Sequence, residues 1–177
     1  MNDTTRITPP RTMMEVFENL PEGTMAQFIN NRIYISPAPA ITHQMVLGKI
    51  FNQLFSLVEN NKLGQSLVAP VDVFLNRKNI YQPDIIFIAN EHLSQLKERG
   101  FYGAPDLVIE ILSPATWRFD KEDKKDEYER SGVKEYWMID PADKSAEGFY
   151  LEGSEFVPAP LQEKKMTLKL IPLVIHF

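Results

Sequence analysis

Hydrophobic and polar positions recur with a regular period over most of the chain. Residues 25–36, MAQFINNRIYIS, contain two alternating runs around Asn30-Asn31, a pair that can adopt the positive φ angles of a tight turn, and they predict a β-hairpin. Apolar residues at helical spacing predict an amphipathic helix over 41–61 that covers one face of a sheet. A shorter helix is expected within 12–20.

Strands are expected in the second half of the pattern. Residues 66–75, 81–89 and 105–113 are rich in β-branched and aromatic side chains, which favour strands. A short helix, EHLSQLKERG, is expected between the last two of these runs. Three further runs, KEYWMID, AEGFYL and SEFVPAP, predict a meander, and MTLKLIPLVI predicts a final strand.

A charged segment, 120–131, is helical by propensity and is followed by Gly132, which is suited to a helix C-terminus. Helices before and after the predicted strands indicate an α/β or α+β domain, in which a central mixed sheet is flanked by helices and preceded by the hairpin. We expect a single domain over 1–177, with 1–12 flexible.

Composition excludes several classes of protein. The 177 residues are 44% hydrophobic and 24% charged, as in ordinary globular domains. Cysteine is absent, which excludes disulfides and thiolate zinc sites. No segment has the pattern of a signal peptide or a membrane span, so we expect a cytoplasmic protein without a membrane partner. The net charge of −5 argues against a broadly basic surface that coats nucleic acid.

Glu110 interrupts the apolar segment PDLVIEILSP, residues 105–114. An ionised carboxylate buried without partners costs roughly several kcal/mol, so Glu110 should be paired, hydrogen-bonded or bound to a metal. Asp84 opens a second apolar run, IIFIA, on a strand that we expect to be a neighbour. Carboxylate oxygens are preferred ligands of Mg²⁺ and Mn²⁺, so the two acids predict a divalent-cation site.

The charged helix adds a third component. Lys124 and Tyr128 are four residues apart and share one face, with Asp120 or Lys121 one turn earlier. A lysine beside such carboxylates can orient or deprotonate the attacking water, or stabilise the charge that develops on a phosphate. The combination favours phosphodiester hydrolysis.

Four segments are informative together: Pro83-Asp84, GAPDLVIEILSP, the Asp-x3-Lys-x3-Tyr pattern of 120–128, and SGVKEYWMID. In combination they resemble the Uma-two family of the PD-(D/E)XK nuclease superfamily. The resemblance extends from the hairpin near Gln27 to about Tyr150. It implies a restriction-endonuclease-like fold and a Mg²⁺- or Mn²⁺-dependent endonuclease that acts on nucleic acid, with DNA as the expected substrate.

The resemblance also implies roles for individual residues. Asp84 and Glu110 would be metal ligands, together with the backbone carbonyl of Ile111. The superfamily's simplest pattern has a lysine two residues after the acid, where this chain has Leu112, and Lys124 would replace it from the helix. The supporting residues would be Gln27, His43, Asp120 and Tyr128.

Gln27 stands where members of the family tend to carry a glutamate. It can form hydrogen bonds but brings no charge, so a second metal ion should bind more weakly here. His43 matches the family's P-x3-H pattern.

Structural interpretations compete with the functional ones. Glu110 could pair with a buried arginine such as Arg118, Lys124 could be a solvated helix residue, and His43 could be a capping or surface group. Asp106 and Asp140 are interpreted as turn or cap residues, and Tyr136 and Trp137 as core. The environment of Asp72 is left open.

Two rival functions follow from these alternatives. One is a nucleic-acid-binding module that keeps the nuclease fold but not the activity, and Gln27 in place of the glutamate would indicate this loss. The other is a structural or interaction protein whose acids form internal salt bridges. Double-strand cutting would require two active sites, so a symmetric homodimer is expected of a nuclease. The sequence does not distinguish DNA from RNA, and it names no cleavage site or biological role.

Overall fold

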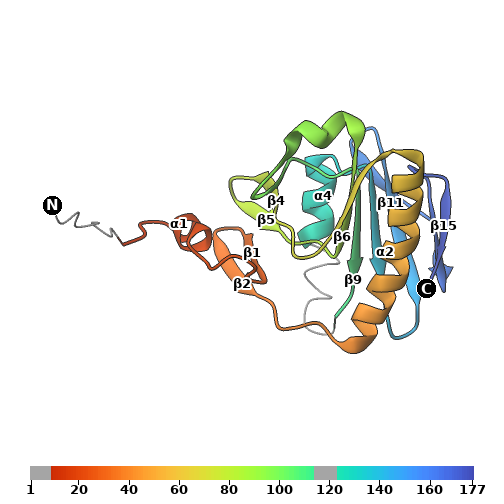
Figure 1. Cartoon of the computed structure of the whole chain (residues 1–177), viewed down its shortest axis with the longest axis horizontal. Helices are drawn as coiled ribbons and strands as arrows, with labels where there is room; N and C mark the ends of the chain where they lie inside the picture. Colours follow the sequence, from red (N-terminus) through yellow and green to blue (C-terminus); the bar gives the residue numbers. More distant parts are fainter. Residues whose placement is uncertain (1–8, 114–122) are drawn as a thin grey trace.

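The computed structural model describes residues 9–113 and 123–177, which form two mixed β-sheets, a small hairpin and flanking helices (Figure 1). In the larger sheet the strand order is β12-β11-β10-β9-β6-β3, with β13 beside β11. Its strands are β3 (Gly64–Val68), β6 (Ile85–Ala89), β9 (Leu107–Ile111), β10 (Glu135–Ile139), β11 (Ser145–Glu152), β12 (Glu155–Pro158) and β13 (Gln162–Glu163). Within the described part of this sheet β9 and β10 are parallel and the other pairs are antiparallel, so the expected mixed sheet is confirmed.

The second sheet has the order β2-β1-β5-β4-β8-β7. Its strands are β1 (Ala26–Ile29), β2 (Arg32–Ile35), β4 (Val73–Asn76), β5 (Asn79–Tyr81), β7 (Leu96–Lys97) and β8 (Gly100–Tyr102). The predicted hairpin is confirmed as β1 and β2, and Asn30 and Asn31 have φ angles of 47° and 67°.

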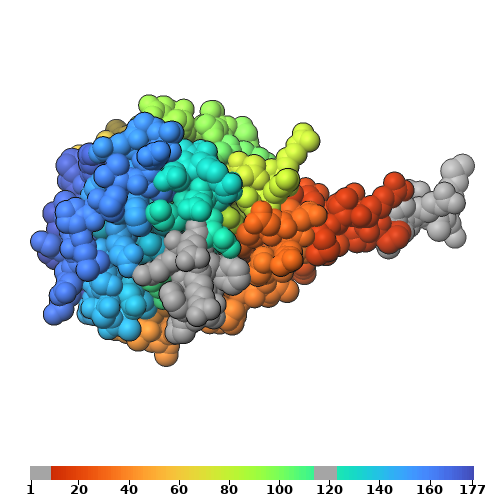
Figure 2. All heavy atoms as spheres, turned by 180° about the vertical axis from the view of Figure 1, so that it is seen from behind, coloured from red at the N-terminus to blue at the C-terminus, as the bar shows by residue number. Residues whose placement is uncertain are grey.

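Helix α1 (Met13–Glu18) packs against this hairpin through Phe17, whose ring centroid lies 5.7 Å from that of Phe28. Thr12 begins the helix by accepting a hydrogen bond from the backbone of Glu15. The helix and hairpin form an arm that projects from the main body, and the space-filling view shows the same narrowing toward the N-terminal side (Figures 1 and 2).

Helix α2 (Ile41–Asn61) covers one face of the larger sheet, as predicted (Figure 1). It contributes Ile50, Leu54 and Val58 to a core that also contains Trp137. The hairpin of β14 (Lys165–Leu168) and β15 (Leu173–His176) packs into the same core. No helix within the described part of the chain is both long and apolar enough to cross a membrane.

Helix α4 (Lys125–Ser131) lies against the other face of the larger sheet. Tyr128 is fully buried there and packs on Tyr136, with ring centroids 5.1 Å apart. Gly132 ends the helix with a φ angle of 89°, a left-handed conformation that glycine adopts without strain. Residues of the second sheet also pack on this face. The side chains between the two sheets therefore form a second core, distinct from the core under α2.

The runs 66–75 and 81–89 were each predicted as one strand, but a proline divides each of them between two strands. The run 66–75 contains β3 and β4 on either side of Pro70, and the run 81–89 contains the end of β5 and all of β6 on either side of Pro83. Proline cannot donate a ladder hydrogen bond, and the chain changes sheet at both positions.

Two other predicted elements differ from the structure. EHLSQLKERG contains part of a 3₁₀ helix, η1 (Asn90–Gln95), followed by β7 and the first residue of β8. MTLKLIPLVI is not one strand but most of the β14–β15 hairpin, with Pro172 in the connecting turn.

The alternation of strands β6 and β9 places their acidic residues on one face. Ile85 and Ile109 are opposite each other in this antiparallel pair and belong to the core under α2. Continuing the register by one residue places Asp84 opposite Glu110 on the face toward α4. The fold therefore brings the two predicted metal ligands together.

Candidate active site

Asp84 lies immediately before β6 and links two other elements. Its Oδ2 accepts a hydrogen bond of 2.7 Å from the backbone nitrogen of Ile111 on β9, and lies 3.3 Å from Nε2 of His43 in the first turn of α2. Within residues 9–113 and 123–177, no hydrogen bond to its other oxygen, Oδ1, is recorded. Asp84 is therefore held in place by one oxygen, while the other remains a candidate ligand.

Glu110 is buried between two donors from the start of α4. Its Oε1 accepts from Nζ of Lys124 at 2.9 Å and from the hydroxyl of Tyr128 at 2.8 Å. Glu110 and Lys124 are each only 4% exposed. Burial, and then the charge of Glu110, raise the pKa of Tyr128 well above its ordinary value, so this phenol stays protonated and donates.

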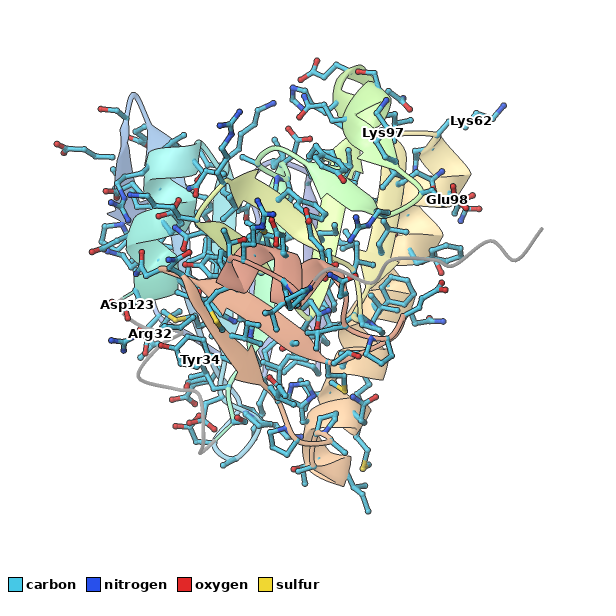
Figure 3. All side chains as sticks on the ribbon, turned by 90° about the vertical axis from the view of Figure 1, so that its left-hand side faces the viewer. Arg32, Tyr34, Lys62, Lys97, Glu98 and Asp123 are labelled. Atoms are coloured by element: carbon cyan, nitrogen blue, oxygen red, sulfur yellow. The ribbon has the colours of Figure 1, made fainter. Side chains whose placement is uncertain are left out.

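Lys124 directly precedes α4, and its ammonium also lies 5.9 Å from the ring centroid of Tyr81. The interpretation of Lys124 as a solvated helix residue is wrong, because the side chain is buried and paired with Glu110. Arg118 and Asp120 lie outside the described residues. Figure 3 looks onto the arm and shows Asp123, the neighbour of Lys124, on the same side as Arg32 and Tyr34 of β2.

His43 is buried at 6% exposure, so it is not a surface group. Burial lowers the pKa of its imidazole, but the hydrogen bond and charge of Asp84, the backbone of Ile111 and the charge of Glu110 outweigh this effect and raise it. Its Nδ1 is buried without a hydrogen-bond partner among the described residues. The predicted use of the Ile111 carbonyl as a metal ligand stays a prediction.

A pocket of about 340 Å³ opens onto these side chains. Its lining includes Gln27, His43, Asp84, Glu110 and Lys124. Gln27 reaches it from β1, and its Oε1 accepts from the backbone nitrogen of Gln82 at 3.4 Å. Five predicted residues from five separate segments therefore line one pocket, and Tyr128 donates a hydrogen bond to one of them, Glu110.

A second group of potential metal ligands, Glu91, His92 and Asp106, lies at the other end of β9. Lys134 occupies the position of a cation there, because its Nζ is 2.8 Å from Asp106 and 3.1 Å from Glu91. Asp106 is 1% exposed and also accepts from the backbone of Ala89 at 2.8 Å. The interpretation of Asp106 as only a turn residue therefore misses a buried ion-pair network.

Asp106→Asn should lower the free energy of unfolding at pH 7 by about 2 kcal/mol, because a charged acceptor is lost from this network. Burial raises the pKa of Asp106, but hydrogen bonds from His92, Lys134 and Ala89 outweigh it, so the folded pKa lies below 3.8. The ionised carboxylate therefore stabilises the fold at pH values above the ordinary pKa of 3.8. This stabilisation is lost as the pH falls through the lower pKa of the folded state.

Urea unfolding at pH 7 and at pH 3 measures both effects. The difference between wild type and Asp106→Asn should shrink at the lower pH. A difference of the same size at both pH values would contradict the electrostatic explanation. Glu91→Gln is the matched control, because Glu91 is exposed and should matter less.

Other acids predicted or overlooked have structural partners. Asp72 accepts from the side chain of Gln82 at 2.8 Å, and burial raises its pKa against the effects of Gln82 and Arg99. Glu135 was missed: it is 1% exposed and accepts from Trp137 Nε1 and from the backbone in the β14–β15 turn. It begins the apolar run EYWMI, which is a weaker signal than the position of Glu110 inside an apolar run.

The remaining structural interpretations are confirmed. Tyr136 and Trp137 are fully buried core residues. Asp140 accepts from the backbone of Ala142 at 2.8 Å in the turn between β10 and β11.

Residues 14–175 match the model of a protein family, Uma2, described as "Putative restriction endonuclease". The chain belongs to the Uma2 family. A solved crystal structure of "a putative nuclease belonging to DUF820 from Anabaena variabilis ATCC 29413" shares the fold of this Uma2 protein, with a TM-score of 0.70 and 20% identity over 84% of each chain. No curated protein matches the sequence. Both descriptions thus name a "putative" nuclease, and the solved structure shows a shared fold.

Proposed function

We propose that this Uma2 protein is a metal-dependent endonuclease that hydrolyses phosphodiester bonds in DNA. The observation that carries the proposal is the meeting of Asp84, Glu110 and Lys124 at one pocket. Two carboxylates on adjacent strands face the same way, and a buried ammonium lies 2.9 Å from one of them. A purely structural ion pair would need neither the pocket nor the second carboxylate.

The donor set fits a hard divalent cation such as Mg²⁺ or Mn²⁺, which takes oxygen ligands and often uses only one or two protein carboxylates. Asp84 and Glu110 would hold the ion, with the Ile111 carbonyl as a further ligand. Asp84 Oδ1 lacks a recorded hydrogen bond within the described residues, as expected of an oxygen reserved for a cation. The bound ion would act as a Lewis acid on the phosphate.

Other residues of the chain would orient the attacking water, stabilise the developing charge and position the two carboxylates. Lys124 would orient the attacking water and stabilise the negative charge that develops on the phosphate. Tyr128 fixes the orientation of Glu110 through its hydroxyl, and Ile111 fixes that of Asp84 through its backbone nitrogen. His43, beside Asp84, would keep that carboxylate from rotating, because their nearest atoms are 3.3 Å apart.

Nicking of supercoiled plasmid DNA tests the proposal. Cleavage should require Mg²⁺ or Mn²⁺ and stop when EDTA removes the ion, since the two carboxylates alone offer no Lewis acid. Cleavage that persists in EDTA would refute metal dependence. Degradation of RNA but not of DNA would refute the assignment of DNA as the substrate. A symmetric homodimer is part of the proposal, because double-strand cutting requires two active sites, and Asp84, Glu110 and Lys124 of one chain form one.

Gln27 favours a second candidate, a nucleic-acid-binding module that does not cleave. The pocket contains an amide where a third carboxylate would strengthen cation binding. Binding of DNA without cleavage at any Mg²⁺ or Mn²⁺ concentration would establish this function in place of the first.

Gln27→Glu should therefore increase Mn²⁺ affinity, by about tenfold, because it adds a charged oxygen ligand to the pocket. Isothermal titration calorimetry measures the change. Gln65→Glu is the control, since Gln65 is an exposed residue of β3 and adds the same charge elsewhere. Equal affinity in wild type and Gln27→Glu would show that position 27 does not face the bound ion.

A further inference from the structure

A second cavity, of about 680 Å³, lies next to the candidate active site. Gln82 lines both cavities, and the start of β1 lies between them. Its volume falls in the range of small-molecule sites, roughly 300–1,000 Å³. Figure 3 shows Lys97 and Glu98, two of its lining residues, on the opposite side of the arm from Asp123.

Two hydrogen-bond acceptors remain in this cavity. Nε2 of Gln82 donates to Oδ1 of Asp72 at 2.8 Å and to the carbonyl of Thr24 at 3.2 Å. These bonds use both amide hydrogens, so the orientation of the amide is fixed. Within the described ranges no hydrogen bond is recorded to Oε1 of Gln82 or to Oδ2 of Asp72. Both residues line the cavity, so an amide oxygen and a carboxylate oxygen of two hydrogen-bonded side chains are candidate acceptors for a ligand there.

The charge of the lining disfavours a phosphate in this cavity. It contains four carboxylates, from Glu18, Glu22, Asp72 and Glu98, against two cations, from Lys97 and Arg99. Leu67, Val71 and Leu96 supply apolar walls. Two acceptors in a net-negative cavity with some apolar walls favour a flat group that has no negative charge and carries two adjacent N–H donors.

Among the DNA bases, guanine presents such a pair, N1–H and the N2 amino group, on its pairing edge. Thymine offers a single N–H there, and adenine and cytosine each offer one amino group beside an acceptor nitrogen. The pairing edge is accessible only in a single strand or in a base turned out of the helix.

We propose that this cavity is a subsite for a guanine base of the substrate strand, and that Asp72 and Gln82 determine this preference. The inference rests on the proposed nuclease function. Gln82 connects the two cavities directly, because its backbone nitrogen donates to Gln27 in the active-site pocket while its side chain bonds Asp72. The second cavity would then recognise a base close to the phosphodiester bond that the active site cleaves.

Titration of dGMP, dAMP, dCMP and dTMP into the protein in EDTA tests the inference without any cleavage. Wild type should prefer dGMP, and Asp72→Asn should weaken dGMP binding by about tenfold or more, because an amide nitrogen can then face the guanine donors. The amide oxygen of the substituted side chain can still accept from Gln82, so the fold should be kept. Glu98→Gln, which removes the same charge from the same cavity, should change affinity by less than about twofold.

Equal binding of the four nucleotides, no binding of dGMP, or unchanged dGMP affinity in Asp72→Asn would each overturn the inference. A single-stranded TTGTT should bind more tightly than dGMP, because the strand also contacts the active-site pocket. Tighter binding of free dGMP would instead assign the cavity to a free nucleotide and overturn the role in substrate reading. Metal-dependent cleavage with no guanine preference would refute this subsite and leave the nuclease proposal intact.

Discussion

Glu110→Gln is expected to lower the rate of metal-dependent DNA cleavage by about 10³-fold or more. Glutamine keeps the size of the side chain and can still accept from Tyr128, whose hydroxyl lies 2.8 Å from Oε1. It lacks the charge that would hold the cation. Loss of Lewis-acid stabilisation costs several kcal/mol of barrier, and each ~1.4 kcal/mol is tenfold in rate.

Plasmid nicking under single-turnover conditions measures this effect, with thermal unfolding as the check on folding. Glu110→Ala is a poorer variant, because it leaves the buried ammonium of Lys124 without this carboxylate and would destabilise the protein by about 3–5 kcal/mol. Glu163→Gln serves as the control, since Glu163 is exposed on β13. Cleavage by folded Glu110→Gln at the wild-type rate would remove Glu110 from the active site.

The second large effect is expected for Lys124→Met. Methionine fills a similar volume but removes the ammonium, so stabilisation of charge on the phosphate is lost and cleavage should fall by about 10²- to 10³-fold. Mn²⁺ affinity should stay equal or increase, because a cation 2.9 Å from Glu110 competes electrostatically with the metal. Loss of rate without loss of metal binding distinguishes Lys124 from a ligand-supporting residue.

Lys125→Met is the matched control for this variant. Lys125 is the next residue, but its ammonium lies 4.9 Å from the ring centroid of Phe149 and not in the pocket. Its replacement should leave cleavage within about twofold of wild type. Equal losses in the two variants would show that charge on this helix, and not the position of Lys124, governs activity.

The arrangement of the two carboxylates could be predicted from sequence because strands have a period of two. Asp84 and Glu110 each occur in an apolar run, and antiparallel pairing of the two strands brings them opposite each other. The four-residue spacing of Lys124 and Tyr128 likewise predicted a shared face, and both side chains contact Glu110. Local periodicity predicted which side chains share a face, but not that Lys124 and Tyr128 contact Glu110.

The division into two sheets could not be predicted in the same way. Pro70 and Pro83 mark where the chain leaves one sheet for the other, but proline specifies only where a ladder is interrupted and not where the chain continues. The burial of Lys124 depends on this division, because β5 of the second sheet brings the ring of Tyr81 over its ammonium. Tertiary packing, and not helix propensity, determines that environment.

A buried acid alone does not identify an active site in this fold. Glu135 and Asp106 are as buried as Glu110, and Glu135 begins an apolar strand. Glu135 is satisfied by backbone and indole donors, and Asp106 by a histidine, a lysine and a backbone nitrogen. What distinguishes Glu110 is a pocket that it shares with a second carboxylate, Asp84.

Calorimetric titration of Mn²⁺ tests the central claim most directly, that Asp84 and Glu110 form a divalent-cation site. The structure predicts saturable binding of about one ion per chain in wild type and in Lys124→Met, and loss of that binding in Asp84→Asn and in Glu110→Gln. Binding that survives both substitutions, or that disappears only in Asp106→Asn, would contradict the assignment of the site.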